Sequence, residues 1–490
     1  MRKSGILMPI FSLPSKYGIG TFGKEAYDFV DKLKLANQMY WQVLPLGPTS
    51  YGDSPYQSFS NFAGNPYFID IETLINEGLL KKIDCDTLCN PDSVGDIDYK
   101  KLYKTRFILL KKAYNNSNLE NDIAFNSFCE NNFYWLEDYA FFMALKDYFN
   151  GISFLEWEDG IKHREQFAMD KYGILLKNEI QFYKFIQYKF FEQWKKLKKY
   201  ANKNKIKIIG DIPIYVALDS AETWSHPTMF MLDKDLKPLK VAGCPPDDFC
   251  KTGQLWGNPV YNWKVHSMTG YNWWSRRILD AIVMYDIVRI DHFRGFAEYY
   301  SIPAKDKTAE NGEWLDGPGI ELFKTIKSKY GKTNIIAEDL GFLTQSATTM
   351  LKKTGFPGMK VLQFAFYENS TSEHLPYNYT NNYICYTGTH DNQTTVGWLS
   401  KLKPSDKRFL RNYLNKSGKI SCYDIISLAL SSVAKLAIIP MQDYLELDDE
   451  ARINTPSTIG NNWKWRITKD QFSEELVLKI GDLTKLYGRQ

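Results

Sequence analysis

The sequence contains an apolar segment that runs directly into a carboxylate, Val288-Arg289-Ile290-Asp291-His292-Phe293-Arg294-Gly295. Two further segments share this pattern, Ile336-Ala337-Glu338-Asp339-Leu340-Gly341 and Tyr386-Thr387-Gly388-Thr389-His390-Asp391-Asn392. Short apolar segments that end in polar or glycine-containing turns are typical of buried parallel strands. One acidic residue after a strand is usually only a turn or helix cap. Three of them, with Arg, His and Gly neighbours, instead favour catalysis by Asp291, Glu338 and Asp391.

Strand-like segments of this kind recur along the whole chain. They lie at residues 5–8, 41–46, 206–210, 287–290, 334–337, 360–364, 383–386 and 437–440. Helix-like stretches separate many of them, for example at residues 26–35, 320–329 and 346–353. This alternation predicts an α/β fold, a (β/α)8 TIM barrel. In such a barrel the carboxyl ends of the strands converge on one face, so the three carboxylates are expected to face one cavity.

The spacing of the strands also predicts large insertions at the C-terminal face of the barrel. We expect residues 1–490 to form a single catalytic barrel domain. The second and third strands are separated by about 160 residues, far more than an ordinary crossover needs. That segment, roughly 48–200, is helix-rich and aromatic and is predicted to form inserted subdomains. A second insertion, roughly 217–280, separates the third and fourth strands.

Composition argues against nucleic-acid and membrane partners. The net charge is +4, and the basic and acidic residues are mixed, whereas a nucleic-acid surface needs clustered basic charge. No stretch approaches the roughly 20 apolar residues of a membrane span. The seven cysteines are odd in number and lack zinc spacing, so we expect free thiols in a reducing, cytoplasmic setting. Aromatic residues make up 15% of the chain, and some of these flat rings suit a sugar-binding groove.

The carboxylate-bearing segments resemble the four short conserved regions of the α-amylase superfamily, in the form found in amylomaltases (4-α-glucanotransferases or disproportionating enzymes). The four similar regions are Gly210-Asp211-Ile212-Pro213-Ile214-Tyr215-Val216, Arg289 to Gly295, Ala337 to Gly341 and Gly388 to Asn392. Five more segments are similar: Pro9-Ile10-Phe11-Ser12-Leu13-Pro14-Ser15, Gly18-Ile19-Gly20, Ser54-Pro55-Tyr56-Gln57-Ser58, Gly253-Gln254-Leu255-Trp256-Gly257-Asn258-Pro259 and Arg452-Ile453-Asn454-Thr455-Pro456. The matches run from residue 5 to about residue 466, and their order and completeness make the resemblance specific.

The resemblance implies a retaining double displacement with a separate role for each carboxylate. Asp291 would be the nucleophile that forms a covalent glycosyl-enzyme. Glu338 would protonate the departing oxygen and then deprotonate the acceptor, which requires a raised pKa and a separation of about 5–5.5 Å from Asp291. Arg289 would be the cationic partner that keeps Asp291 ionised. Asp391 would hold sugar hydroxyls and favour the distorted, oxocarbenium-like ring.

The resemblance also implies a set of substrate-binding residues. They are Tyr56, Asp211, Gln254, Trp256, Arg289, His390, Asn454 and Phe249. Tyr56 and Trp256 are expected to stack on glucose units or to hydrogen-bond to them. His390 would donate to the sugar beside Asp391, and His292 is a further functional histidine.

Two positions depart from the family pattern. Phe249 matches a mobile loop that covers the bound glucan. In that loop Asp248 stands where many relatives carry an aromatic residue, which would alter the grip on the acceptor sugar. Pro456-Ser457-Thr458 replaces the more usual Pro-Gly-Thr.

Three functions remain open at this point, and all concern α-glucans. Transfer of an α-1,4-glucan segment to the 4-hydroxyl of another glucan is the preferred hypothesis. An α-amylase-type hydrolase would use the same carboxylates. Against it, little chain follows the last barrel strand to form a β-sandwich domain, and no calcium-loop spacing is evident. A non-catalytic starch-binding protein is disfavoured by the intact triad. Neither metal nor organic cofactor is needed, and the expected partners are maltooligosaccharides and amylose, with glycogen a further candidate.

Overall fold

The computed structural model describes residues 2–91, 94–246, 251–341, 344–367 and 371–490. Its centre is a sheet of eight parallel strands in the order β10-β11-β12-β1-β2-β3-β6-β9. The strands are β1 (Lys3–Leu7), β2 (Tyr40–Gln42), β3 (Lys207–Ile212), β6 (Ile287–Ile290), β9 (Ile335–Ala337), β10 (Gly358–Val361), β11 (Tyr383–Tyr386) and β12 (Leu436–Pro440). The Ala337 N–H donates to the Pro357 carbonyl at 2.9 Å, which joins β9 to the start of β10. The two edge strands thus lie side by side, the sheet is nearly closed into a barrel, and the predicted (β/α)8 fold is confirmed.

Two of the expected strands differ in their bounds. The strand expected at 41–46 ends at Gln42 as β2, although the Val43 N–H still donates to the Ile209 carbonyl of β3 at 2.9 Å. The strand expected at 360–364 lies earlier, as β10, and Leu362–Phe364 forms a 3-10 helix instead. Gly358 allows this early start, because a side chain there would come within 2.2 Å of the carboxylate of Asp339.

The barrel interior is filled by side chains from alternate strand positions. Leu7, Ile209, Ile336, Tyr386 and Ile438 belong to one buried cluster that is separate from the larger core outside the barrel. Residues on a strand point alternately to opposite faces. The outward-facing residues therefore pack under the surrounding helices, and the interior is a core with no open channel.

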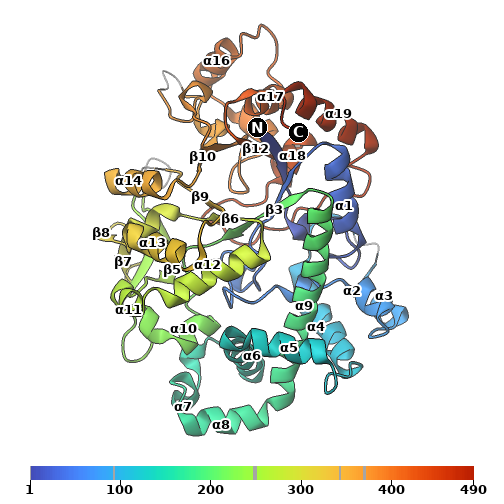
Figure 1. Cartoon of the computed structure of the whole chain (residues 1–490), viewed down its shortest axis with the longest axis vertical. Helices are drawn as coiled ribbons and strands as arrows, with labels where there is room; N and C mark the ends of the chain where they lie inside the picture. Colours follow the sequence, from blue (N-terminus) through green and yellow to red (C-terminus); the bar gives the residue numbers. More distant parts are fainter. Residues whose placement is uncertain (1, 92–93, 247–250, 342–343, 368–370) are drawn as a thin grey trace.

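Helices surround the barrel on its outer side (Figure 1). They include α1 (Lys24–Leu35), α9 (Lys177–Lys203), α12 (Asn272–Met284), α13 (Gly319–Tyr330), α14 (Gln345–Thr354), α15 (Thr395–Lys401), α16 (Pro404–Tyr413), α17 (Cys422–Ser431), α18 (Met441–Tyr444) and α19 (Glu474–Leu486). The C-terminal α19 packs against α1, so both ends of the chain lie on the same side of the barrel (Figure 1).

The long segment between β2 and β3 is helical. It contains α2 (Ile71–Asn76), α3 (Lys82–Leu88), α4 (Tyr99–Asn115), α5 (Ile123–Asn131), α6 (Phe133–Tyr148), α7 (Asp159–Lys162) and α8 (Gln166–Leu175), and it leads into α9. Aromatic side chains join these helices, as where Trp135 of α6 meets Phe191 of α9 with ring centroids 5.8 Å apart. Aromatic rings of this segment therefore form part of its hydrophobic core.

A second sheet lies beside the barrel and was not predicted from the sequence. Its antiparallel strands are β4 (Lys240–Cys244), β5 (Gln254–Pro259), β7 (Glu298–Pro303) and β8 (Glu313–Asp316), in the order β5-β4-β7-β8. Only β4 and β5 come from the segment 217–280, which also contains α10 (Ala221–Ser225) and α11 (Trp263–Met268). The other two strands follow Asp291, so two separate connections build this sheet.

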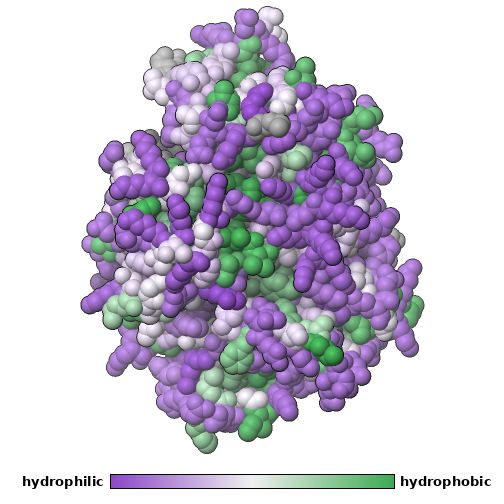
Figure 2. Space-filling model, viewed as in Figure 1, coloured by the Kyte–Doolittle hydropathy of each residue, from purple (hydrophilic) through white to green (hydrophobic). Residues whose placement is uncertain are grey.

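One face of the molecule is shown in Figure 2. It is mostly hydrophilic, with an apolar area near its middle, where α9 and α12 approach each other (Figures 1 and 2). Among the helices of the described residues, none is both long and apolar enough to cross a membrane.

Candidate active site

The cavity that contains the predicted carboxylates opens at the carboxyl ends of the barrel strands. It has a volume of about 900 Å3. Of the predicted residues, its lining includes Tyr56, Gln254, Trp256, Asp291, His390, Asp391 and Asn454. Asp211, Arg289 and Glu338 are buried and do not form part of this lining. Phe249 and Asp248 lie outside the described residues.

Asp291 follows β6 directly and is held by the neighbouring strand and by Arg289. Its N–H donates to the Ile212 carbonyl at 3.0 Å, which continues the pairing of β6 with β3. Its Oδ1 lies 3.0 Å from Arg289 Nη1. The Asp291 side chain retains 29% of its exposure, whereas Arg289 is buried. The carboxylate therefore reaches the cavity while its cationic partner stays behind it.

Arg289 serves two carboxylates at once. It pairs with Asp211 of β3 as well as with Asp291. These two charges outweigh the cost of burial and hold the pKa of the guanidinium well above its ordinary value. Burial raises the pKa of Asp211, while the charge of Arg289 opposes that shift. The Tyr56 hydroxyl donates to Oδ2 of Asp211 at 2.7 Å, which ties the aromatic wall of the cavity to this buried network.

Glu338 has the environment of a carboxylic acid that stays protonated near neutrality. It follows β9 and is 9% exposed. Its Oε1 accepts from the Leu340 N–H and its Oε2 from the His292 N–H, both at 2.7 Å. Burial, and next the charge of Asp291, raise its pKa to about 8, against the opposing effects of Arg289 and the two backbone bonds. Two carboxylates with different environments are the usual arrangement of an acid and a nucleophile.

His292, whose N–H donates to Glu338, has an unusual backbone conformation. Its φ of 50° lies in the left-handed region, which is uncommon for a non-glycine residue. The ring packs edge-on against Trp256 with centroids 5.0 Å apart. Burial lowers the pKa of the imidazole to about 4, so this histidine is neutral at physiological pH. Strain of this kind is often found at functional sites.

Asp391 lines the same cavity and is fixed by two neighbouring side chains. The Asn454 amide donates to its Oδ1 at 2.6 Å, and His390 Nε2 lies 3.3 Å from its Oδ2. The His390 ring stacks on Tyr56, with centroids 5.1 Å apart and planes inclined by 13°. Asp391 keeps 41% side-chain exposure, so both histidine and asparagine orient it without covering it.

Arg452 and Trp463, for which the sequence predicts no role, also lie next to Asp391 and His390. Arg452 Nη2 donates to the Asp391 carbonyl at 2.6 Å. Trp463 lies behind the stacked pair, 5.9 Å from the Tyr56 ring and 6.1 Å from the His390 ring. Arg452 belongs to the segment 452–456, which resembles the family, so the sequence did contain a signal that could have identified it. Trp463 is one of 13 tryptophans and no local pattern distinguishes it.

Gln254 and Trp256 belong to β5 of the second sheet. The Trp256 indole N–H donates to the Gln254 side-chain oxygen at 3.1 Å. The Trp256 ring also lies 6.0 Å from that of Tyr215, which follows β3. The second sheet therefore supplies one aromatic wall of the cavity that contains Asp291. Among the described residues, no group of His, Cys, Asp and Glu side chains is arranged to hold a metal ion.

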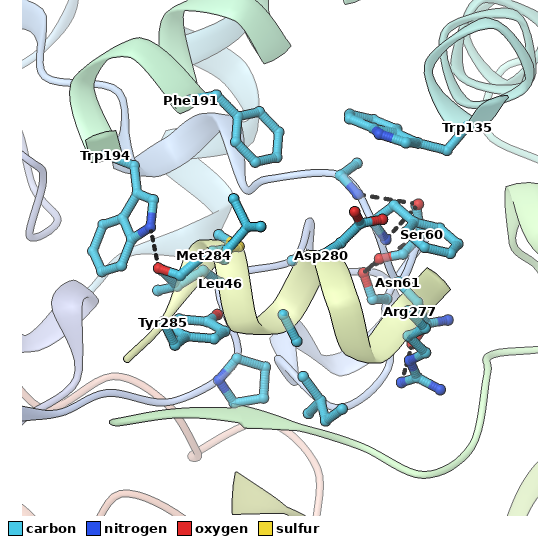
Figure 3. A pocket seen from close by; sticks show the side chains of 18 of the residues that line it. Leu46, Ser60, Asn61, Trp135, Phe191, Trp194, Arg277, Asp280, Met284 and Tyr285 are labelled. Carbon is cyan, nitrogen blue, oxygen red and sulfur yellow. Dashed lines mark hydrogen bonds between the residues drawn. The ribbon is translucent and has the colours of Figure 1, made fainter. Parts of the chain in front are cut away.

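A second cavity, of about 600 Å3, lies between α9 and α12 on the outer side of the barrel (Figure 3). Its apolar lining includes Trp135, Phe191 and Trp194, and the Trp194 indole donates to the Met284 carbonyl at 3.0 Å (Figure 3). Of the predicted site residues, only Asp211 contributes to this lining. The carboxylates thus place the candidate active site in the other cavity.

Comparisons with known proteins agree on one family. The family model described as 4-alpha-glucanotransferase matches residues 8–471. The 4-alpha-glucanotransferase of Clostridium butyricum is 50% identical over 485 residues, which cover 98% of this chain and 100% of that protein. That of Streptococcus pneumoniae (TIGR4) is 47% identical, covering 100% of this chain and 97% of the relative. The structure of an amylomaltase from Streptococcus agalactiae in complex with acarbose superposes with a TM-score of 0.97 at 43% identity, covering both chains completely. The chain belongs to the 4-alpha-glucanotransferase family.

Proposed function

We propose that this enzyme moves a segment of an α-1,4-glucan to the 4-hydroxyl of an acceptor glucan or glucose by retaining double displacement. The observation that carries the proposal is the contrast between Asp291 and Glu338. One carboxylate is ion-paired and reaches the cavity, and the other is buried with a pKa raised to about 8. Such a pair suits a nucleophile and a proton donor that act together on one glycosidic bond.

In the first step an oxygen of Asp291 attacks the anomeric carbon of the donor. The bond from that carbon to the 4-oxygen of the leaving glucan breaks, and Glu338 gives its proton to that oxygen. The product is a covalent glycosyl-enzyme and a shortened glucan. Arg289, 3.0 Å from Asp291, holds the nucleophile in place before the attack.

The second step reverses these roles. Glu338, now ionised, takes the proton from the 4-hydroxyl of the acceptor, and the acceptor oxygen attacks the anomeric carbon and releases Asp291. In both steps positive charge develops on the sugar ring. Asp391 is suited to stabilise this charge and to hold ring hydroxyls, because Asn454 and His390 fix its two oxygens while leaving it accessible.

Transfer requires sugar to compete successfully with water for the glycosyl-enzyme. Aromatic walls support this, since rings that fill the acceptor region exclude water and orient the incoming hydroxyl. Tyr56 and Trp256 both line the cavity as candidate stacking surfaces, and the Gln254 side chain accepts a hydrogen bond that orients Trp256. We further propose that the loop containing Phe249 covers the bound glucan.

We also propose a domain organisation for the chain. Residues 1–490 form one catalytic barrel unit, on which the segments 48–200 and 217–280 act as insertions that shape the glucan-binding side. The free thiols of Cys85, Cys385 and Cys422 support action in a reducing, cytoplasmic compartment. The substrates are maltooligosaccharides and amylose, with glycogen ends as a further candidate.

Incubation of the pure enzyme with maltotriose tests the proposal. Transfer yields glucose and a ladder of longer maltooligosaccharides while the number of reducing ends stays constant. A steady rise in reducing ends without a ladder would instead identify a hydrolase that uses the same carboxylates. An Asp291→Asn variant with undiminished turnover would remove Asp291 from the nucleophile's role.

A further inference from the structure

A third cavity lies at the opposite end of the barrel from the carboxylates. Its volume is about 810 Å3, and its lining includes residues at the amino ends of β6, β9 and β12 and the loops that follow α13 and α14. These two helices lie next to each other on the outside of the barrel (Figure 1). None of the residues proposed for glucan transfer contributes to it, so any ligand it takes acts apart from that chemistry.

The polar part of this lining is strongly basic. Six lysines contribute to it and no aspartate or glutamate does: Lys3, Lys324, Lys327, Lys332, Lys353 and Lys435. Lys324 is paired with Glu321 at 2.7 Å, and Lys3 Nζ contacts the Gln490 carbonyl. For Lys327, Lys332 and Lys353, the described residues provide no ion pair within 4.0 Å. The cavity therefore has more positive charge than its protein neighbours balance.

Helix dipoles account for only part of this cluster. Lys327 lies in the last turn of α13 and Lys353 in that of α14, where a cation interacts favourably with the helix C-terminus. Lys332 and Lys435 lie in loops, before β9 and β12 respectively. They are close enough that the charge of Lys332, together with burial as the larger cause, lowers the pKa of Lys435. Both ammonium groups line this cavity, and an anion bound between them would offset their mutual repulsion.

The remainder of the lining is apolar and partly accessible. Tyr40, Ile320 and Phe356 are half-buried there, and Phe323 and Ile335 lie deeper. The space is larger than a lone phosphate requires. A ligand that fills it would combine a flat or apolar body with two or more negative charges. Asp286 precedes the lining residue Ile287, and its carboxylate is already engaged by the Asn202 amide at 2.8 Å and by the Ile208 N–H at 2.7 Å.

We propose that this cavity binds a nucleoside di- or triphosphate, with the phosphates between Lys332 and Lys435 and the base against the apolar wall of Tyr40, Ile320 and Phe356. Lysine is a common partner of phosphate as a compact charge, and the chain needs no glycine-rich loop for this mode of binding. The Lys435 ammonium already donates to the Asn382 side chain at 3.0 Å, which holds it at the cavity.

Isothermal titration of the whole protein with ATP, ADP, adenosine, pyrophosphate and inorganic phosphate at one ionic strength tests the proposal. ATP and ADP should bind saturably at one site, more tightly than adenosine or pyrophosphate. A Lys332→Gln/Lys435→Gln double variant should weaken ATP binding about tenfold or more, as expected from the loss of charge-assisted hydrogen bonds. The affinity should also fall as salt rises, because both lysines keep contact with solvent, where dissolved ions screen their charges.

A matched control removes two lysines far from the cavity in sequence and structure. Lys100→Gln/Lys104→Gln on α4 changes the net charge equally, and it should leave ATP affinity within twofold of that of the unaltered protein. Glucose release from maltotriose should be unchanged in both double variants, so the result is independent of the proposed transfer reaction. Equal losses of ATP affinity in the two double variants, no saturable binding, or pyrophosphate binding as tight as ATP would overturn the proposal.

Discussion

The backbone N–H of His292 donates to Oε2 of Glu338 at 2.7 Å, and the two residues follow β6 and β9, which pair side by side in the barrel. The turn after β6 that contains Asp291 and His292 therefore also positions Glu338, the proposed proton donor. This bond and that from Leu340 stabilise the ionised carboxylate, whereas burial and the charge of Asp291 stabilise the protonated form. The second pair of effects is larger, which leaves the pKa of Glu338 at about 8.

Activity should fall as pH rises through about 8, because Glu338 must be protonated to act on the donor. The measurement is kcat/KM for glucose release from maltotriose between pH 5 and 10. Loss of general acid catalysis in a Glu338→Gln variant should lower kcat/KM by about 10²–10⁴-fold. The residual activity of that variant should show no decline near pH 8. The same decline in both proteins would assign it to another group.

Glu338 should also make the stability of the protein depend on pH. The folded protein keeps this proton up to about pH 8, whereas the unfolded chain releases it near the ordinary carboxyl pKa of 4.5. The folded state binds more protons between these values, so this group's stabilising contribution is complete below pH 4.5 and is lost as pH rises to 8. A Glu338→Gln variant cannot ionise there. Its Tm relative to the unaltered protein should therefore increase from pH 5 to pH 8.5, and a constant difference would contradict the raised pKa.

The barrel could be predicted from the sequence because its strands are continuous apolar runs. The strands expected at 287–290 and 383–386 coincide with β6 and β11. The second sheet escaped prediction for a physical reason. Strand β8 has the sequence Glu-Trp-Leu-Asp and is largely exposed, and β5 has the sequence Gln-Leu-Trp-Gly-Asn-Pro, so in neither do apolar and polar residues alternate along the sequence.

In the site, too, features that follow from a local sequence motif could be predicted, whereas contacts between residues far apart in the sequence could not. Asp291 and Glu338 could be proposed because each directly follows an apolar strand. The bond from the His292 N–H to Glu338 could not, because it depends on a left-handed residue whose conformation no local motif specifies. Trp463 reaches the stacked rings of Tyr56 and His390 from a remote part of the chain, which sequence spacing does not reveal.

Tyr56 should contribute through both its hydroxyl and its ring, and two variants separate these contributions. Tyr56→Phe removes the bond to Asp211 but keeps the ring stacked on His390. We expect its kcat/KM for maltotriose to fall about tenfold, the value of one hydrogen bond to a charged group. Tyr56→Ala also removes the stacking surface and should cost about tenfold more. Equal losses in the two variants would show that the ring does not support the bound sugar.

Asp443 should act as a positioning residue for Asp391, although it does not touch the cavity of the carboxylates. It is buried after β12 and accepts bonds from the Thr387 hydroxyl at 2.5 Å and from the Thr395 N–H at 2.8 Å. These partners are the two ends of the loop that carries His390 and Asp391. Asp443→Ala should lower the free energy of unfolding by about 2–4 kcal/mol, since several buried donors lose their acceptor. It should also reduce kcat at a temperature where the variant remains folded.

A control must separate positioning from a general loss of stability. Asp424 offers one, because it caps α17 through the Ser421 N–H at 2.6 Å and pairs with Lys416, away from the loop 387–395. Asp424→Ala should lower Tm by weakening this cap while kcat for glucose release stays within twofold of normal. For Asp443→Ala the loss in kcat should exceed tenfold, because the loop that aligns Asp391 is released at both ends. Equal kcat values for the two variants would mean that Asp443 stabilises the fold without orienting the site.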